Sequence, residues 1–363
     1  MASSPSAEAQ ALAGLARPAG RARRQLWLGL GLLGLTLGLA LVSLWVGSLR
    51  LGLGELLAAL FGVGDETTRH VVYQIRLPRT LGAVLAGGGL GLAGLAMQTH
   101  LRNGLASPFT LGVSQGAVFG AAFAILVLGA GQVNGLASEL TLTGAPWLIA
   151  GCAFAAALAT TLAILALAAL RGLGPQSVVL AGVALSALFA ASTMLLQYFA
   201  TDTQVAATVF WTFGDVGKFT WADLALLAPV VLLAWGWLQL RAGALDALLW
   251  GDEVAASLGV RVRFERLAGL VLAALATATA IAFAGIIGFV GLLAPHTVRL
   301  LAGNDHRRLV PYTALFGAAL LLFADVLGRS LLAPVVLPVG ILTAFAGAPL
   351  FLALLLPRRG AGL

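Results

Sequence analysis

The sequence predicts an all-α protein: a polytopic integral membrane protein with about ten transmembrane helices. Apolar residues make up 60% of its 363 residues and charged residues only 10%. Soluble domains carry about 25% charged residues, which cover their surface. The mean hydropathy is +1.00. The 46 glycines show no three-residue period, which excludes a collagen-like fibre, and in an apolar chain they favour close helix–helix packing.

Ten runs of roughly 20 mostly apolar residues are long enough to cross a bilayer as helices. Their unbroken apolar character excludes barrel strands, which would alternate over about ten residues. Gly285 and Gly288 predict a tight reversal between the seventh and eighth runs, and without that reversal nine spans remain. The predicted spans are Leu26–Val46, Thr80–Gln98, Phe109–Gly129, Trp147–Leu170, Val178–Phe199, Asp223–Leu240, Leu267–Ala284, Ile286–Leu301, Val310–Gly328 and Val336–Leu356.

The first 25 residues precede these spans and have no core-forming pattern. They are rich in Ala, Ser, Pro and Arg, which predicts a disordered cytoplasmic leader over residues 1–25. The first span, Leu26–Val46, is longer than the apolar region of a signal peptide and is followed by no clear cleavage site, so we expect an uncleaved signal-anchor. The transmembrane domain then covers residues 26–357, and residues 358–363 form a cytoplasmic tail.

Basic residues set the orientation of the spans. With ten spans, both termini and every even-to-odd connection lie on one side, which holds 15 of the 21 basic residues. An excess of Lys and Arg marks the cytoplasmic side. This pattern explains the net charge of +7 better than nucleic-acid binding does. The cytoplasmic set is Arg17, Arg21, Arg23, Arg24, Arg102, Arg171, Arg241, Arg261, Arg263, Arg266, Arg299, Arg307, Arg308, Arg358 and Arg359. The other six are Arg50, Arg69, Arg76, Arg79, Lys218 and Arg329.

Two arginines flank the extracytoplasmic start of the second span. Arg76 and Arg79 surround Pro78, and proline is tolerated in the first turn of a helix because its missing N–H has no partner there. Arginine can bind a carboxylate of an acidic partner with two hydrogen bonds. Alternatively, the two side chains extend toward lipid phosphates. The residues alone leave both interpretations open.

Residues 241–266 are cytoplasmic and too polar to cross the membrane. Asp252 is placed to cap a short helix, with Glu253 in its first turn, and Gly259 supplies a left-handed stop. The helix offers a small apolar face for a groove on a cytoplasmic partner, or for the surface of an anionic membrane. That face consists of Ala255, Ala256 and Leu258.

Several residue types needed for other functions are missing. A phosphate-binding loop ends in Gly-Lys-Ser/Thr, but the only lysine, Lys218, is followed by Phe219, so any ATP hydrolysis must occur on another chain. Ionisable residues are almost absent from the spans, which gives little support to ion coupling. Asp325 and Arg329 lie near one end of their span with the spacing of a helical ion pair.

The cysteine and histidine content argues against redox and metal sites. The single cysteine, Cys152, excludes disulfides within one chain. The four histidines lack the spacing of metal ligands, and His296 is more typical of a hydrogen bond between helices. We therefore predict no metal site, no catalytic residues and no cofactor in this chain.

A series of motifs, in order, covers nearly everything from Arg76 to Pro357. Together they resemble the permeases of iron–siderophore, haem and cobalamin ABC importers, the FecCD type. The stretches that carry the resemblance are IRLPRTLGAVLAGGGLGLAGLAMQ, LRNGLASPFTLGVSQGA, LAGVALSALF, GDEVAASLGVRV, GFVGLLAPHTVRLLAGNDHRRLVP, ADVLGR and LPVGILTAFAGAPLF.

The resemblance implies a type II ABC importer permease fold in the bacterial inner membrane. Such a subunit forms a homodimer, or pairs with a homologous subunit, around a central pathway. Two cytoplasmic ABC ATPase subunits bind ATP and Mg²⁺ on one side, and a substrate-binding protein docks on the extracytoplasmic side. The permease itself is not an enzyme.

Site residues also follow from the resemblance. The arginines that meet a glutamate on each lobe of the binding protein match Arg76, Arg79 and Arg329. The residues that contact the ATPases match Gly251, Asp252, Glu253, Ala255, Ala256, Leu258 and Gly259. The cytoplasmic gate matches Pro175, Gln176 and Ser177, where relatives can have small hydroxyl residues, so Pro175 and Gln176 depart from that pattern. The fifth span would line the pathway.

The expected function is therefore import of a ferric siderophore, driven by ATP hydrolysis on separate subunits. The same role for haem or cobalamin is the alternative within the family. An ion-coupled secondary transporter and a structural or assembly protein of the membrane are alternatives from other classes.

Overall fold

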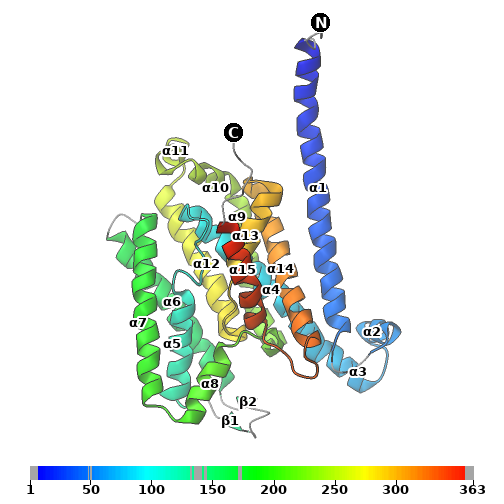
Figure 1. Ribbon diagram of the computed structural model, residues 1–363, viewed down its shortest axis with the longest axis vertical. Helices are drawn as coiled ribbons and strands as arrows, with labels where there is room; N and C mark the ends of the chain where they lie inside the picture. Colours follow the sequence, from blue (N-terminus) through cyan, green and yellow to red (C-terminus); the bar gives the residue numbers. More distant parts are fainter. Residues whose placement is uncertain are drawn as a thin grey trace.

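The computed structural model describes residues 7–47, 49, 51–130, 133–134, 141–142, 145–170 and 174–355. Apart from one two-residue strand pair, the regular structure in these ranges is helical. The long helices run roughly side by side, with α1 at one edge of the bundle and α7 at the other (Figure 1). An all-α bundle of apolar helices was predicted, and this prediction is confirmed.

Ten helices correspond to the ten predicted spans. Among the described residues, seven helical segments are long and apolar enough to cross a membrane, and three apolar helices are shorter. The long set contains α1 (Ala7–Trp45), α4 (Leu77–His100), α6 (Pro146–Ala169), α7 (Pro175–Tyr198), α9 (Trp221–Leu240), α12 (Val262–Ala284) and α14 (His306–Ser330). The short set is α5 (Val113–Leu126), α13 (Val290–Ala302) and α15 (Val339–Leu355).

Short elements occupy the two ends of the bundle (Figure 1). At the end of the bundle from which the N-terminal part of α1 projects lie α10 (Ala242–Leu249) and α11 (Asp252–Ser257), on the side away from α1. The opposite end carries α2 (Leu53–Leu60), α3 (Glu66–His70), the π-helical turn η1 (Val71–Arg76), α8 (Asp202–Thr212), the 3₁₀ turn η2 (Val216–Lys218), and the antiparallel strands β1 (Val133–Asn134) and β2 (Thr141–Leu142).

The second span begins earlier than predicted. Instead of starting near Thr80, a helical stretch of 35 residues runs from Glu66 to His100. The π turn Val71–Arg76 directly precedes α4. Pro78 lies in the first turn of α4, the position that the sequence predicted and where proline is tolerated.

The N-terminal leader also differs from the prediction. Helix α1 starts at Ala7, so most of the segment predicted to be disordered over residues 1–25 is helical backbone continuous with the first span. The segment contains Ala, Leu, Arg, Glu and Gln, all residues of high helix propensity. The predicted tail, residues 358–363, lies outside the described residues.

The predicted reversal between α12 and α13 is confirmed. Helix α12 ends at Ala284, Gly285 has a φ of 81°, and α13 starts at Val290. Phe289 also adopts a left-handed φ of 64°, which is rare for a residue with a bulky side chain. The intervening Ile286 pairs with Phe213, which follows α8.

Helix α4 is the centre of the bundle and is buried along most of its length. Its glycines allow neighbouring backbones to approach closely. Gly94 lies against the carbonyl of Gly291 on α13, and Gly87 lies against Gly317 on α14. Gly94 and Gly291 thus form a direct backbone contact between α4 and α13.

Candidate functional site

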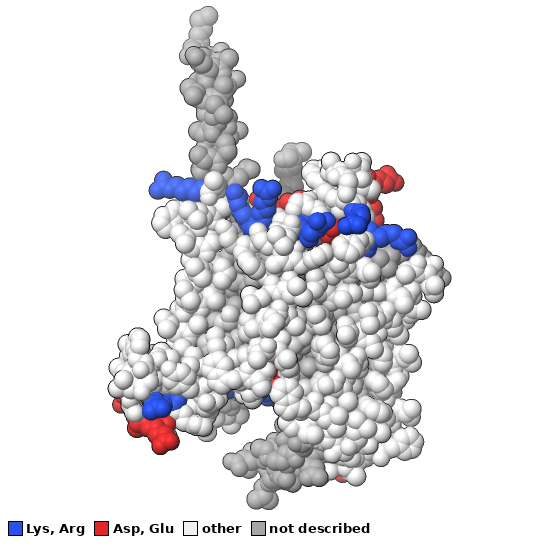
Figure 2. Space-filling model, turned by 180° about the vertical axis from the view of Figure 1, so that it is seen from behind, with Lys and Arg blue, Asp and Glu red and all other residues white. Residues whose placement is uncertain are grey.

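Charged side chains gather at the two ends of the bundle. Figure 2 shows a band of arginines around the end that carries α10 and α11, an uncharged middle, and a smaller charged cluster at the other end. We call the first the basic end and the second the opposite end. Among the described side chains this separation agrees with the sequence-based orientation; those of Arg17, Arg21, Arg50, Arg171, Arg358 and Arg359 lie outside them.

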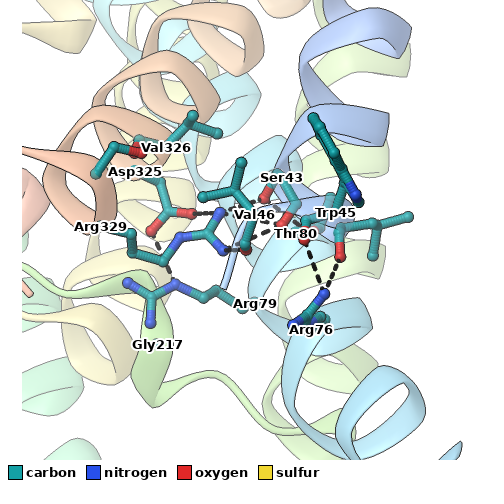
Figure 3. A network of polar contacts seen from close by, with 12 residues as sticks. Ser43, Trp45, Val46, Arg76, Arg79, Thr80, Gly217, Asp325, Val326 and Arg329 are labelled. Atoms are coloured by element: carbon teal, nitrogen blue, oxygen red, sulfur yellow. Dashed lines mark hydrogen bonds and ion pairs between the residues drawn. The ribbon is translucent and has the colours of Figure 1, made fainter. Parts of the chain in front are cut away.

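At the opposite end, Asp325 of α14 connects two arginines (Figure 3). Its side chain is 0% exposed and forms ion pairs with Arg79 at 2.8 Å and with Arg329 at 2.7 Å. Arg79 also lies 3.5 Å from the partly exposed carboxylate of Asp215. The pairing of Asp325 with Arg329, which the four-residue spacing predicted, is confirmed.

Two arginines at the same end, Arg76 and Arg329, donate hydrogen bonds to the last carbonyls of α1 (Figure 3). Arg329 donates to the carbonyl of Ser43 at 3.1 Å and to that of Val46. Arg76, only 4% exposed, donates to the carbonyls of Leu44 at 2.8 Å and Trp45 at 3.0 Å. The final four carbonyls of a helix have no intrahelical partner, so two cations here both satisfy them and complement the helix dipole.

The structure therefore brings Arg76, Arg79 and Arg329 together, as the docking prediction requires. Their guanidinium groups are directed at α1, Asp325 and Asp215 rather than outward. Arg76 is buried and the Arg329 side chain is only 8% exposed, so neither extends toward lipid. A role in docking stays a prediction. The contacts with α1 carried no sequence signal, because carbonyl groups occur at every residue.

At the basic end, Asp252 begins the short helix α11 rather than capping it. Gly251, at a φ of 114°, precedes the helix. The Asp252 carboxylate instead accepts two hydrogen bonds from Arg266 of α12, at 2.9 and 3.0 Å, and lies 3.5 Å from Arg102. The predicted capping role of Asp252 is thus wrong, because the pairing with two cations directs its carboxylate away from the helix N–H groups.

The rest of α11 separates into a buried and an exposed side. Gly259 has a φ of 83°, which confirms the predicted left-handed stop. Ala255 is fully buried, whereas Ala256 is exposed and Leu258 is 67% exposed. Only part of the predicted apolar face is therefore available to a partner.

A second connection at the basic end starts from Asp246 of α10. Its carboxylate accepts from Nδ1 of His306 at 2.6 Å and from the His306 backbone N–H at 3.1 Å. Although burial opposes ionisation, these hydrogen bonds hold the pKa of Asp246 below its usual range. The stabilisation from this lowered pKa is present above the ordinary carboxyl pKa and is lost as the pH falls through the lowered value.

The predicted gate residues form the first turn of α7. Gly174 is extended, Pro175 occupies the start of the helix, and Gln176 is exposed. A proline suits this position since the first helical N–H groups have no partner. Most of the α7 surface beyond this turn is apolar and not buried, including Leu180, Val183 and Met194.

Sequence analysis missed a cavity of about 610 Å³ at the opposite end. Its walls include Trp147, Trp211 and Phe283, with Asp215 and Lys218 among its polar groups. Lys218 donates to the carbonyl of Phe213 at 3.2 Å. In the part of the chain that the structure describes, no three His, Cys, Asp or Glu side chains form a possible metal site.

Comparisons with known proteins identify relatives over almost the whole chain. The model of the FecCD transport family matches residues 35–357. A protein of Methanocaldococcus jannaschii described as an ABC transporter permease is 47% identical over 317 residues, 87% of this chain and 90% of that protein. The hemin transport system permease protein of Yersinia pestis is 37% identical over 340 residues, 94% and 98% of the two chains.

A solved structure has a similar fold. It is described as a metal-chelate type ABC transporter in an inward-facing conformation, and it superposes with a TM-score of 0.78 at 31% identity. The match covers 90% of this chain and 97% of the other.

Proposed function

The chain belongs to the FecCD transport family, and on that premise we propose that it is the permease subunit of an ABC importer for a metal chelate. The proposed substrate is a ferric siderophore, with haem or cobalamin as the alternative. ATP is hydrolysed with Mg²⁺ on two separate ATPase subunits. The observation that carries the proposal is the exposed apolar side chain of Leu258, which directly follows α11 at the basic end.

The basic end is the proposed cytoplasmic side, where α11 enters a groove on an ATPase. Leu258 and Val254 are exposed, and Ala256 beside them is small enough to permit close approach. A short amphipathic helix that inserts apolar side chains into a groove is a recurrent mode of recognition. The lack of a phosphate-binding loop in this chain supports ATP hydrolysis on a partner.

The opposite end is the proposed docking surface for an extracytoplasmic binding protein. Arg79 is the most accessible of the three arginines, with 15% of its side chain exposed, compared with 8% for Arg329. Its contact with Asp215, at 3.5 Å, is also longer than its contact with Asp325. A glutamate on the partner could replace Asp215 as a ligand of Arg79 without disrupting the buried pair.

The apolar surfaces of α7 and α15 support pairing with a second copy or a homologous subunit around a central pathway. Helix α7 exposes Leu188 and Met194, and α15 exposes Phe345. A pathway lined by small and apolar residues, with Pro175–Ser177 near its cytoplasmic end, suits passage of a bulky substrate that another protein has already captured.

Transport in proteoliposomes tests this proposal. The permease is reconstituted with its ATPase and binding protein, and uptake of ferric siderophore, haem and cobalamin is compared with and without ATP. We expect ATP-dependent uptake of ferric siderophore that persists when ion gradients are collapsed. Uptake that is independent of ATP and requires an ion gradient would instead support a secondary transporter.

Substituting the exposed face of α11 should uncouple the complex. We expect Leu258→Asp combined with Ala256→Arg to lower ATP-driven uptake at least tenfold, because charge would enter an apolar groove. Assembly and ATP hydrolysis are measured alongside uptake. Asn304→Asp, an exposed change at the same end, is the control; normal uptake by the α11 variant would contradict the contact.

Neutralising Arg79 should weaken docking of the binding protein. We expect Arg79→Gln to raise the dissociation constant about tenfold at low salt, with a smaller difference at high salt because salt screens the attraction between charges on the two proteins. The matched control is Arg69→Gln, an exposed arginine of α3 at the same end. Equal affinities for the two variants at low salt would refute the docking role of Arg79.

A further inference from the structure

Both helices of the coupling segment, residues 241–266, are connected to the carboxyl end of α4. Helix α10 is linked to α4 through His306, the first residue of α14. Nδ1 of His306 hydrogen-bonds Asp246 of α10, and Nε2 lies 2.9 Å from the hydroxyl of Thr99 on α4. Helix α11 contacts it through Arg266, which bonds Asp252 and donates from Nε to the carbonyl of His100 at 3.1 Å. Two independent connections thus end on consecutive residues, Thr99 and His100.

These connections are buried and specific. Thr99 and His306 are fully buried, and Arg266 is almost fully buried. Burying a guanidinium is costly unless its hydrogen bonds are satisfied, and removing its partner leaves an uncompensated charge. Arg266 can bond two elements at once because its planar group offers donors in several directions, which a lysine ammonium on a flexible stem reproduces poorly.

The backbone around Asp252 is arranged for the same contacts. Arg102, just beyond α4, adopts a left-handed φ of 46°, an uncommon conformation for a residue with a side chain. Its guanidinium lies 3.5 Å from the Asp252 carboxylate. The ring of His100 packs directly on Gly269 of α12, where a Cβ would overlap it. The ends of α4, α11 and α12 therefore fit together with little freedom to slide.

Helix α4 also reaches the proposed docking surface. It begins at Leu77, and Arg79 in its first turn forms the ion pair with Asp325. Its 24 residues end at His100. A helix of this length extends about 36 Å, so one rigid element joins the two functional ends. Packed helices of this kind move as bodies rather than deforming continuously.

We propose that Arg266 and His306 are positioning residues that transmit motion of the coupling segment to α4. Through Asp252 and Asp246 they hold α11 and α10 on Thr99 and His100, so that ATPase-driven displacement of the segment moves α4 as a body. This inference rests on the proposed function, because it requires that α11 contacts an ATPase.

The test measures substrate transported per ATP hydrolysed in the full reconstituted complex. Asp252→Asn removes the charge pairing at a position whose side chain is 38% exposed, and Thr99→Val removes the hydrogen bond to His306 with little change in shape. We expect each to lower the ratio about three- to tenfold, and the double variant to lower it further. Arg308→Gln breaks an exposed ion pair of 3.9 Å at the same end and is the control.

A cross-link separates failure of this inference from failure of the proposed function. Leu258→Cys is introduced into a Cys152→Ala background, since Cys152 is the only cysteine, and is cross-linked to cysteines along the ATPase groove. Absence of a cross-link in the otherwise unaltered permease would overturn the proposed contact itself. Normal cross-linking together with an unchanged transport ratio in both Asp252→Asn and Thr99→Val would overturn the role of Arg266 and His306.

Discussion

Replacing Asp325 by asparagine is expected to lower the free energy of unfolding by about 3–5 kcal/mol, the range for removing one partner of a buried ion pair. Asp325 is fully buried and pairs with Arg79 and Arg329. Without its charge, two guanidinium groups would remain close together, with only the partly exposed Asp215 nearby. Arg329 also binds the final carbonyls of α1, so its displacement would loosen that helix.

Thermal unfolding of the purified protein in detergent measures this effect. Asp202→Asn removes an exposed carboxylate at the same end and should change the melting temperature little. The double variant Asp325→Asn with Arg329→Gln should recover part of the loss, because it removes one of the two unpaired cations. A melting temperature for Asp325→Asn equal to that of Asp202→Asn would show that the pairing contributes nothing.

The helices were predictable from the sequence because crossing a membrane is a local property. A run such as Trp147–Leu170 needs only enough apolar length, and the structure places α6 at Pro146–Ala169. The turn at Gly285 was likewise predictable from the residue itself, because glycine easily adopts the left-handed backbone found there. The early start at Glu66 was missed since its first residues are polar and their helix is stabilised by neighbours.

The candidate sites were only partly predictable, because their partners are distant in the chain. Arg79 and Arg329 were identified from motifs, and Asp325 from its four-residue spacing to Arg329. The hydrogen bond between Thr99 and His306 joins residues 207 positions apart, and nothing local to either residue indicates it. Asp252 shows the same limit, since its local position favours capping but Arg266 binds its carboxylate.

Adding one methyl group at Gly94 is the other change with a large expected effect. A Cβ at this position would overlap the backbone carbonyl of Gly291 on α13, and a backbone carbonyl cannot move aside by changing rotamer. Helices α4 and α13 would have to separate along a buried interface. Overpacking of a core costs about 1–3 kcal/mol, and we expect Gly94→Ala to lie at the upper end of that range.

Gly236→Ala on α9 is the matched control, because no atom lies within 4 Å of its added Cβ. In a helix interior, alanine is more favourable than glycine by about 0.5–1 kcal/mol, so this variant should unfold at a higher temperature than the unaltered protein. The same chemical change is thus expected to have opposite signs at the two sites. If Gly94→Ala were also stabilising, α4 and α13 could not be in the close contact that places Thr99 and His100 beneath the coupling segment.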